Sequence, residues 1–196
     1  MPDEQRPQSL YEERFEHDAC GVGFIANIDG RRDHDTIADA LTALACLKHR
    51  GATDADEKTG DGAGVQFEIP EAFFRDEFER LAGRRPSDGP IAVGMVFLAP
   101  DVADRVRGIV NYVLRERGFE FVWREVPQDP SVLGRKATDT LPVIQQVIVA
   151  SEDGTGRLEL DRRLYAARKE ADTRARNPGV QEPYFASFSC RRVVYK

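Results

Sequence analysis

The feature that most constrains the fold is an almost uninterrupted apolar run, IAVGMVFLA, at residues 91–99. A strand with one face in water alternates apolar and polar side chains, whereas a continuous apolar run is typical of a strand covered on both faces. We therefore expect this segment to lie inside a sheet that has other elements packed on both of its sides.

The segments around this run follow helix and strand patterns. Apolar residues at three- and four-residue spacing predict helices at residues 34–49, 71–82, 101–117 and 161–176. Runs of high β propensity predict strands at residues 22–29, 65–69, 119–126, 141–150 and 184–195, with an irregular loop at residues 127–140. The helices are spaced too irregularly for a doubly wound sheet, so the predicted fold class is α+β. The strand and helix order at about residues 90–150 indicates an inserted α/β subdomain.

Two of the predicted helices carry further expectations. The helix at residues 34–49 has Asp35 and Thr36 as polar residues for its start. Cys46 lies near the apolar side of this helix, and we expect it to pack there. The helix at residues 161–176 is strongly charged, which is typical of an outer, solvated helix. The only residues it offers for burial are Leu164, Tyr165, Ala167 and Ala171.

Charge and cysteine content exclude several classes of function. The net charge is −6 and the basic residues form no cluster, which argues against a nucleic-acid or membrane-surface partner. No apolar run approaches the roughly 20 residues that span a bilayer, and residues 1–19 lack the apolar core of a secretory signal. The cysteines are Cys20, Cys46 and Cys190, and their spacing gives neither a disulfide framework nor a metal site. We therefore expect a cytoplasmic protein that binds a small metabolite and no metal.

Cys20 is the candidate nucleophile. It lies between a charged tail and an apolar run, and the neighbouring Gly21 and Gly23 allow a ligand or the backbone to approach closely. The structural alternative is a small buried hydrophobic residue at the start of a strand. The choice between these roles depends on which group could activate the thiol.

Two familiar kinds of site fit the sequence poorly. A thiol activated by an imidazole needs a nearby histidine. The histidines are His17, His34 and His49, and nothing in the sequence pairs one of them with Cys20. Their spacing is also not that of metal ligands. The sequence GDGAG at residues 60–64 resembles a phosphate-binding loop, but it leads into a strand instead of a helix. Asp61 within this loop would also repel a phosphate.

A third kind of site needs no histidine. If residues 1–19 are a leader that is removed, Cys20 becomes the first residue and its own α-amino group can act as the base. Such a group has a pKa of about 7.7–8.0, so an appreciable fraction of it is neutral in the cytoplasm. The thiolate can then attack a carbonyl carbon while amide donors stabilise the oxyanion. This arrangement accounts together for the leader, the glycines and the missing histidine.

Several spaced motifs resemble one family. They are CGVGFIA at residues 20–26, LACLKHRGA at 44–52, DEKTGDGAG at 56–64, AVGMVFL at 92–98, WREVP at 123–127, VLG at 132–134, RRLYAAR at 162–168, SFS at 187–189 and VVYK at 193–196. In this order they are similar to the class II glutamine amidotransferase domain that begins the large subunit of glutamate synthases. This domain is an N-terminal nucleophile hydrolase, with two antiparallel sheets stacked between helix layers in an αββα sandwich. The resemblance covers residues 20–196, and it implies an incomplete domain preceded by a leader at residues 1–19.

The resemblance implies roles for five residues. Cys20 matches the glutaminase nucleophile. Arg50 and Gly51 match the His-Arg-Gly element beside the nucleophile. Their structural alternative is a helix end, with Arg50 as a terminal cation and Gly51 as a left-handed residue, and both interpretations can hold. Gly60 and Asp61 match the loop before the second strand, where we favour a structural role.

The resemblance also implies a reaction and its partners. The intact protein is expected to hydrolyse L-glutamine to glutamate and ammonia through a Cys20 thioester, and to pass the ammonia to 2-oxoglutarate. FMN and an iron–sulfur cluster are expected in the full-length family enzyme, with no cofactor in this segment. Expected partners are the remainder of the glutamate synthase chain and its small subunit. The family's oxyanion-hole Asn-Gly and its Arg-Phe-Ser-Thr segment are not found here, so we expect the isolated chain to be inactive. A non-catalytic fragment or interaction module is the alternative.

Overall fold

The computed structural model describes residues 21–152, 154–176 and 183–196. The chain divides into two compact units, Met1–Ala52 and Thr53–Lys196, which are described separately below. Cys20 lies outside the described residues, so the structure says nothing about its surroundings.

The first unit contains the predicted helix. It forms α1 (His34–Cys46), which continues as a 3₁₀ turn, η2 (Leu47–Arg50). The start differs from the prediction, because Asp33 caps the helix through a hydrogen bond of 2.9 Å from the backbone N–H of Thr36 to its Oδ1. Hydrogen bonds from Thr36 and Arg31 lower the pKa of Asp33 to about 2. Cys46 is exposed within this unit, so the expectation that it packs is wrong for this structure.

The strand predicted at residues 22–29 is not formed. Val22, Phe24 and Ile28 are 89%, 93% and 101% exposed, and the described part of this unit contains no strand. An extended segment is stable only when a neighbouring strand takes up its hydrogen bonds and another layer covers its apolar side chains. Residues 21–52 offer neither of these, so the alternating pattern stays without a partner here.

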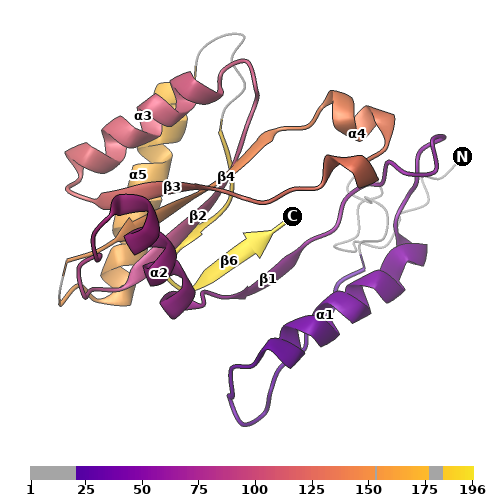
Figure 1. The fold of residues 1–196 in the computed structure, drawn as a ribbon, viewed down its shortest axis with the longest axis horizontal. Coiled ribbons are helices and arrows are strands. Elements are labelled where there is room, and N and C mark those ends of the chain that lie inside the picture. The colour runs from indigo at the N-terminus through magenta and orange to yellow at the C-terminus, as the bar shows by residue number, and fades with distance from the viewer. Residues whose placement is uncertain (1–20, 153, 177–182) are drawn as a thin grey trace, which may run out of the picture. The chain divides into compact units, whose positions relative to one another are not determined.

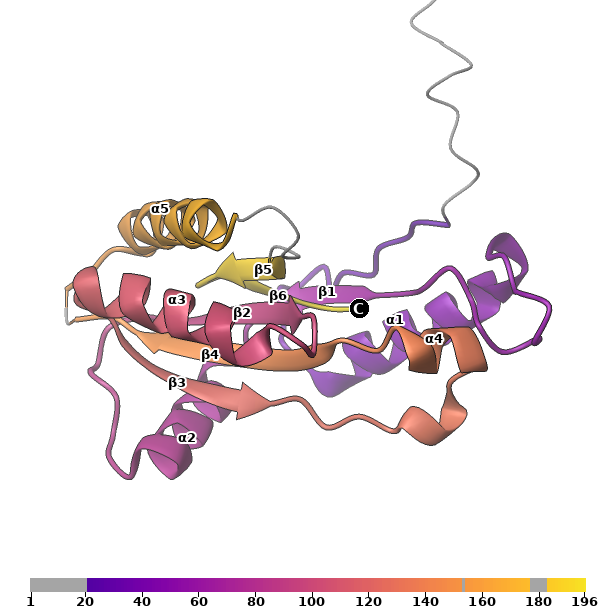
Figure 2. The same ribbon diagram turned by 90° about the horizontal axis from the view of Figure 1, so that it is seen from above.

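The second unit is built on an antiparallel four-stranded sheet with the order β3-β4-β2-β5 (Figures 1 and 2). Its strands are β2 (Ile91–Leu98), β3 (Glu120–Glu125), β4 (Val143–Ala150) and β5 (Tyr184–Ser189). The apolar run forms β2, which pairs with β4 on one side and with β5 on the other. The prediction of a strand inside a sheet is therefore confirmed.

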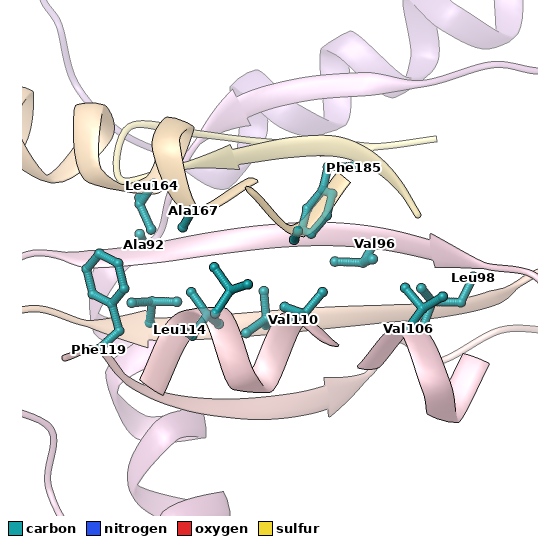
Figure 3. Close-up of a cluster of buried hydrophobic side chains, with 14 of the residues drawn as sticks. Ala92, Val96, Leu98, Val106, Val110, Leu114, Phe119, Leu164, Ala167 and Phe185 are labelled. Carbon is teal, nitrogen blue, oxygen red and sulfur yellow. The ribbon is translucent and has the colours of Figure 1, made fainter. Parts of the chain in front are cut away.

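Both faces of this sheet are covered. Helices α3 (Ala103–Glu116) and α5 (Arg157–Ala175) pack on one face (Figure 2), where they enclose Ala92 and Val96 of β2 (Figure 3). Helix α2 (Glu71–Ala82) packs on the other face, against Val93 and Met95. A small antiparallel sheet of β1 (Val65–Glu68) and β6 (Arg192–Tyr195) contributes to this second core. Successive side chains of β2 thus enter two different cores, as the period of a strand requires.

Helix α5 begins earlier than predicted, and it buries Leu164, Ala167 and Ala171 as predicted. Its buried residues are Leu160, Leu164, Ala167, Ala171 and Ala175. Their spacing of three and four residues places them on one side of the helix, facing the sheet. Tyr165 is 63% exposed, so the prediction that it is buried is wrong. It follows Leu164 directly, and adjacent residues point in different directions around a helix.

Two other segments differ from the prediction. The strand expected at residues 184–195 is split into β5 and β6, which belong to different sheets. Asp161 of α5 causes the break by accepting hydrogen bonds from the Cys190 backbone N–H, at 2.9 Å, and from the Ser189 hydroxyl, at 3.0 Å. The loop expected at residues 127–140 contains two short helices, η3 (Pro130–Val132) and α4 (Arg135–Asp139).

The α+β class predicted from the sequence is confirmed, because helices and purely antiparallel strand pairs share this unit. That residues 90–150 are an insertion stays a prediction. In the described part of the chain, no helix combines the length and the apolar character needed to cross a membrane.

Candidate functional site

The first described residue, Gly21, lies against the turn that carries Arg50. A methyl group built on Gly21 would lie 3.2 Å from Cδ1 of Leu47 and 3.5 Å from Cβ of Arg50. The first of these distances is shorter than an ordinary carbon–carbon contact. A side chain at position 21 would therefore force the neighbouring Leu47 to shift. The structure thus brings the residue that follows Cys20 close to the predicted site residue Arg50.

Arg50 is the last residue of η2, which ends the first helical segment. Lys48, His49 and Arg50 place basic side chains in its final turn, where cations interact favourably with the carboxyl end of the helix. Gly51 has φ −93° and ψ 155°, and its N–H donates to the carbonyl of Lys48. The prediction of a left-handed Gly51 is wrong, because the helix ends through a tighter 3₁₀ turn whose exit is extended.

The guanidinium of Arg50 is open to an incoming anion. Arg50 is exposed, and no carboxylate among the described residues lies within ion-pair distance of it. A guanidinium presents its N–H donors in a planar fork that matches a carboxylate in a two-point contact. Arg50 can therefore bind a substrate carboxylate without first releasing a protein partner from the described part of the chain.

Gly60 and Asp61 lie in the second unit, in the loop that leads into β1. Thr53 and Gly60 form an isolated antiparallel bridge, and the Asp54 N–H donates to the Thr59 carbonyl at 2.8 Å. The loop turns through Glu57, which has a positive φ of 57°. Asp61 follows this bridge directly and is exposed. The loop therefore fixes the backbone at Gly60 and leaves Asp61 at its exit.

Asp56 organises this loop, and the sequence interpretation missed it. Its Oδ1 accepts the backbone N–H groups of Thr59 at 2.7 Å and Lys58 at 3.0 Å, and its Oδ2 accepts the Thr59 hydroxyl at 2.6 Å. These hydrogen bonds, above all those from Thr59, lower the pKa of Asp56 to about 2. An aspartate that accepts the backbone N–H two residues further on, as Asp56 does from Lys58, is a common turn pattern, so this signal was present in the sequence.

The buried thiol of Cys190 does not suit catalysis. Cys190 is 1% exposed, and its thiol lies 3.3 Å from the carbonyl of Arg157. Burial, followed by the proximity of Asp161, raises the pKa of Cys190 to about 11. Within the described residues, no group of three or more His, Cys, Asp or Glu side chains could hold a metal ion.

The predicted site residues therefore fall into two pairs. Arg50 and Gly51 lie in the first unit, next to Gly21, whereas Gly60 and Asp61 lie together in the second unit. Each pair is defined within its own unit. Cys20, the fifth predicted residue, is outside the described part of the chain.

Comparisons with known proteins agree with the motifs. Residues 20–196 match the model of the family described as "Glutamine amidotransferases class-II". The chain is 38% identical over 192 residues to the "Glutamate synthase [NADPH] large chain" of Azospirillum brasilense. This match covers 96% of the present chain and 13% of that protein. It is 42% identical over 184 residues to "Ferredoxin-dependent glutamate synthase 2" of Synechocystis sp., covering 92% of this chain and 12% of that protein. The chain thus spans about an eighth of these relatives, and its α+β fold fits the N-terminal nucleophile hydrolase type.

Proposed function

Because the chain belongs to the class II glutamine amidotransferases, we propose that it hydrolyses the side-chain amide of L-glutamine with Cys20 as the nucleophile. The observation that carries this proposal is the start of the family match at residue 20, directly after the predicted leader. The contact between Gly21 and the turn of Arg50 supports it, because the residue beside the nucleophile lies close to Cβ of Arg50, a second predicted site residue.

The proposed reaction begins when residues 1–19 are removed. The free α-amine of Cys20 takes the thiol proton, and the thiolate attacks the side-chain carbonyl carbon of glutamine. The amine then gives the proton to the leaving nitrogen, the C–N bond breaks, and ammonia departs. A water molecule attacks the resulting thioester, its proton passes to the amine, and the C–S bond breaks to release glutamate. An amine with a pKa of about 7.7–8.0 can perform both proton transfers near neutral pH.

Arg50 is proposed to bind the α-carboxylate of glutamine. Its exposed guanidinium has no anionic partner among the described residues, and it lies on the same turn that contacts Gly21. Gly51 supports this turn. Gly60 and Asp61 are proposed to support the site from the second loop, with a structural role favoured over direct chemistry.

In the whole protein, we propose that the ammonia is delivered to 2-oxoglutarate, as in a cytoplasmic glutamate synthase. The names of the relatives support this, since they are glutamate synthases that use NADPH or ferredoxin. FMN and an iron–sulfur cluster would belong to other parts of that protein. The remaining glutamate synthase chain and a small subunit are the proposed partners, and the isolated 196-residue chain is proposed to be inactive.

A non-catalytic interaction module is the second candidate. The almost complete exposure of Val22, Phe24 and Ile28 favours it, because exposed apolar side chains in one segment are typical of a binding surface. The two candidates differ in what happens when Cys20 is replaced.

The test replaces Cys20 by alanine in the intact protein. We expect Cys20→Ala to abolish glutamine-dependent glutamate synthesis and to leave ammonia-dependent synthesis unchanged. The exposed Cys46 provides a matched control, and Cys46→Ala is expected to retain both activities. If Cys20→Ala retained glutamine-dependent synthesis, the proposed nucleophile would be wrong. If the unaltered protein consumed no glutamine, the interaction module would be favoured.

A further inference from the structure

We propose that the turn at residues 134–136 positions the loop at residues 53–60, with Gly134 and Asp56 as positioning residues for glutamine turnover. This turn lies at the start of α4, which Figure 1 shows at the end of the long connection between β3 and β4. The link between the two segments follows from the structure of the second unit alone. Its effect on turnover rests on the proposed function, since Gly60 ends the loop and Asp61 follows it directly.

The loop has little to hold it in place by itself. Its internal hydrogen bonds join near neighbours, and most of its residues are exposed. Glu57 takes a left-handed conformation, which is unfavourable for a residue with a side chain. A segment with few buried contacts opens locally at low cost unless another part of the protein restrains it. The restraint must therefore come from outside the loop.

Asp56 connects the loop to the turn. Besides its three hydrogen bonds within the loop, its carboxylate lies against Gly134, and the nearby backbone N–H of Arg135, the first residue of α4, contributes to the lowered pKa of Asp56. Gly134 has no side chain that could cap this short helix. Asp56, from a distant part of the sequence, therefore lies beside the start of a helix whose own N-cap residue has no side chain.

Gly134 makes this connection possible because it lets the loop approach its backbone. Gly134 is buried and has φ −74° and ψ 165°, a conformation that any residue adopts. A methyl group built there would overlap with the Thr59 hydroxyl and the Asp56 carboxylate, and would lie 2.7 Å from the Thr59 nitrogen. Glycine is therefore required by the packing of the loop and not by backbone strain.

An ion pair provides a second link. Nζ of Lys136 lies 2.5 Å from Oδ2 of Asp54, whose side chain is 30% exposed, while that of Lys136 is 71% exposed. An exposed pair of this kind contributes little by itself. It nevertheless joins the same two segments at a different point, so the turn holds the loop through Asp54 as well as through Asp56.

The chain offers a matched control for Gly134. Gly156 has φ −71° and ψ 143° and directly precedes α5, just as Gly134 precedes α4. A methyl group on Gly156 would meet no atom within 4 Å. The two alanine variants thus alter glycines of similar backbone conformation at the same position relative to a helix. Only Gly134→Ala introduces a steric overlap with the loop.

The first measurement follows the loop directly in the intact protein. A glutamate-specific protease is added, and cleavage after Glu57 is followed by the mass of the fragments. We expect Gly134→Ala to be cleaved there at least about tenfold faster than the unaltered protein, because cleavage tracks the open population when reclosing is fast. Gly156→Ala should be cleaved at the unaltered rate. Equal rates for the two variants would overturn the inference.

The second measurement asks whether the restraint serves the site. Gly134→Ala is expected to raise KM for glutamine at least about tenfold, which corresponds to about 1.4 kcal/mol, while ammonia-dependent synthesis is unchanged. Faster cleavage with an unchanged KM would overturn the positioning role but not the proposed function. A protein that consumes no glutamine at all would refute the proposed function, and the cleavage result would still decide whether the turn holds the loop.

A charge reversal covers the case in which Gly134→Ala does not fold. Lys136 is mostly exposed, so Lys136→Glu should fold, but it places a second carboxylate beside Asp54. We expect faster cleavage after Glu57 in this variant. Adding Asp54→Lys should restore slow cleavage, because opposite charges again face each other. Failure of Lys136→Glu to speed cleavage, or of the double reversal to slow it, would count against the inference.

Discussion

The substitution Glu77→Gln tests how the polar residues beneath α2 stabilise the second unit. Oε2 of Glu77 lies 2.6 Å from Nε of Arg124, and the two side chains are only 17% and 15% exposed. Arg124 also donates to Oε1 of Gln146 at 2.9 Å, and Gln146 donates to the Tyr195 hydroxyl at 2.8 Å. The carboxylate thus anchors a hydrogen-bonded chain from α2 through β3 and β4 to β6.

The expected loss in the free energy of unfolding follows from the lowered pKa of Glu77. Hydrogen bonds from Arg80, and then from Arg124, lower the pKa of Glu77 from its ordinary value of 4.5 to about 2. A tenfold change in proton affinity corresponds to about 1.36 kcal/mol, so the ceiling is about 3.4 kcal/mol. The Arg80 side chain is 61% exposed and contributes less than its geometry implies. We therefore expect Glu77→Gln to lower the free energy of unfolding by about 2 kcal/mol at pH 7.

The lowered pKa of Glu77 also predicts how this stabilisation changes with pH. Because the folded-state pKa is lowered, this stabilisation is complete above about pH 4.5 and is lost as the pH falls towards 2. The assay is urea unfolding followed by the fluorescence of Trp123, the single tryptophan of this chain, at pH 7 and at pH 3. The two proteins should differ clearly at pH 7 and much less at pH 3.

Glu79→Gln is the control within the same helix. Glu79 pairs with Arg85, but their side chains are 47% and 86% exposed, so the expected loss is below about 0.5 kcal/mol. If Glu77→Gln and Glu79→Gln had equal effects, or if the effect of Glu77→Gln did not depend on pH, the reasoning would be refuted.

Three further predictions concern the core, a thiol and the substrate. Gly94→Ala places a methyl group 2.7 Å from Cγ1 of Val147 inside the sheet, and should cost about 1–3 kcal/mol in urea unfolding; no measurable loss would contradict this packing. In the native protein at pH 8, Cys190 should resist a thiol reagent while Cys46 reacts, as peptide mapping after the reaction would show; modification of both at one rate would contradict the burial of Cys190. Arg50→Gln should raise KM for glutamine by at least about tenfold in steady-state kinetics, because a charged hydrogen bond contributes about 1.5–3 kcal/mol; an unchanged KM would contradict its proposed role.

The central sheet could be predicted because its evidence is local in sequence. An almost uninterrupted apolar run places β2 inside a sheet, and three- and four-residue spacing locates α2 and α3. The burial of Tyr165 was predicted wrongly because α5 is mostly charged, and the narrow apolar stripe of this helix is difficult to locate from the sequence. The break between β5 and β6 depends on Asp161, which lies far away in the chain. The pattern at residues 22–29 needs a partner that residues 21–52 do not contain.

At the candidate site, too, features with a local sequence pattern could be predicted, and features that depend on distant residues could not. Cys20 could be proposed as a nucleophile from its glycine neighbours and from the lack of a histidine partner. The conformation of Gly51 was missed because it depends on whether the helix ends in an α or a 3₁₀ turn. The contact of Gly134 with Asp56 and Thr59 joins two segments that are distant in sequence, so no local sequence pattern predicts it.

The central claim is that Cys20 attacks glutamine after the leader has been removed. The most direct test treats the intact protein with a diazoketone analogue of glutamine, which alkylates an active-site nucleophile, and then maps the modified peptide by mass spectrometry. We expect a single adduct on the sulfur of Cys20, in a peptide whose first residue is Cys20. An adduct on another residue, or an adduct on Cys20 with residues 1–19 still attached, would contradict the claim.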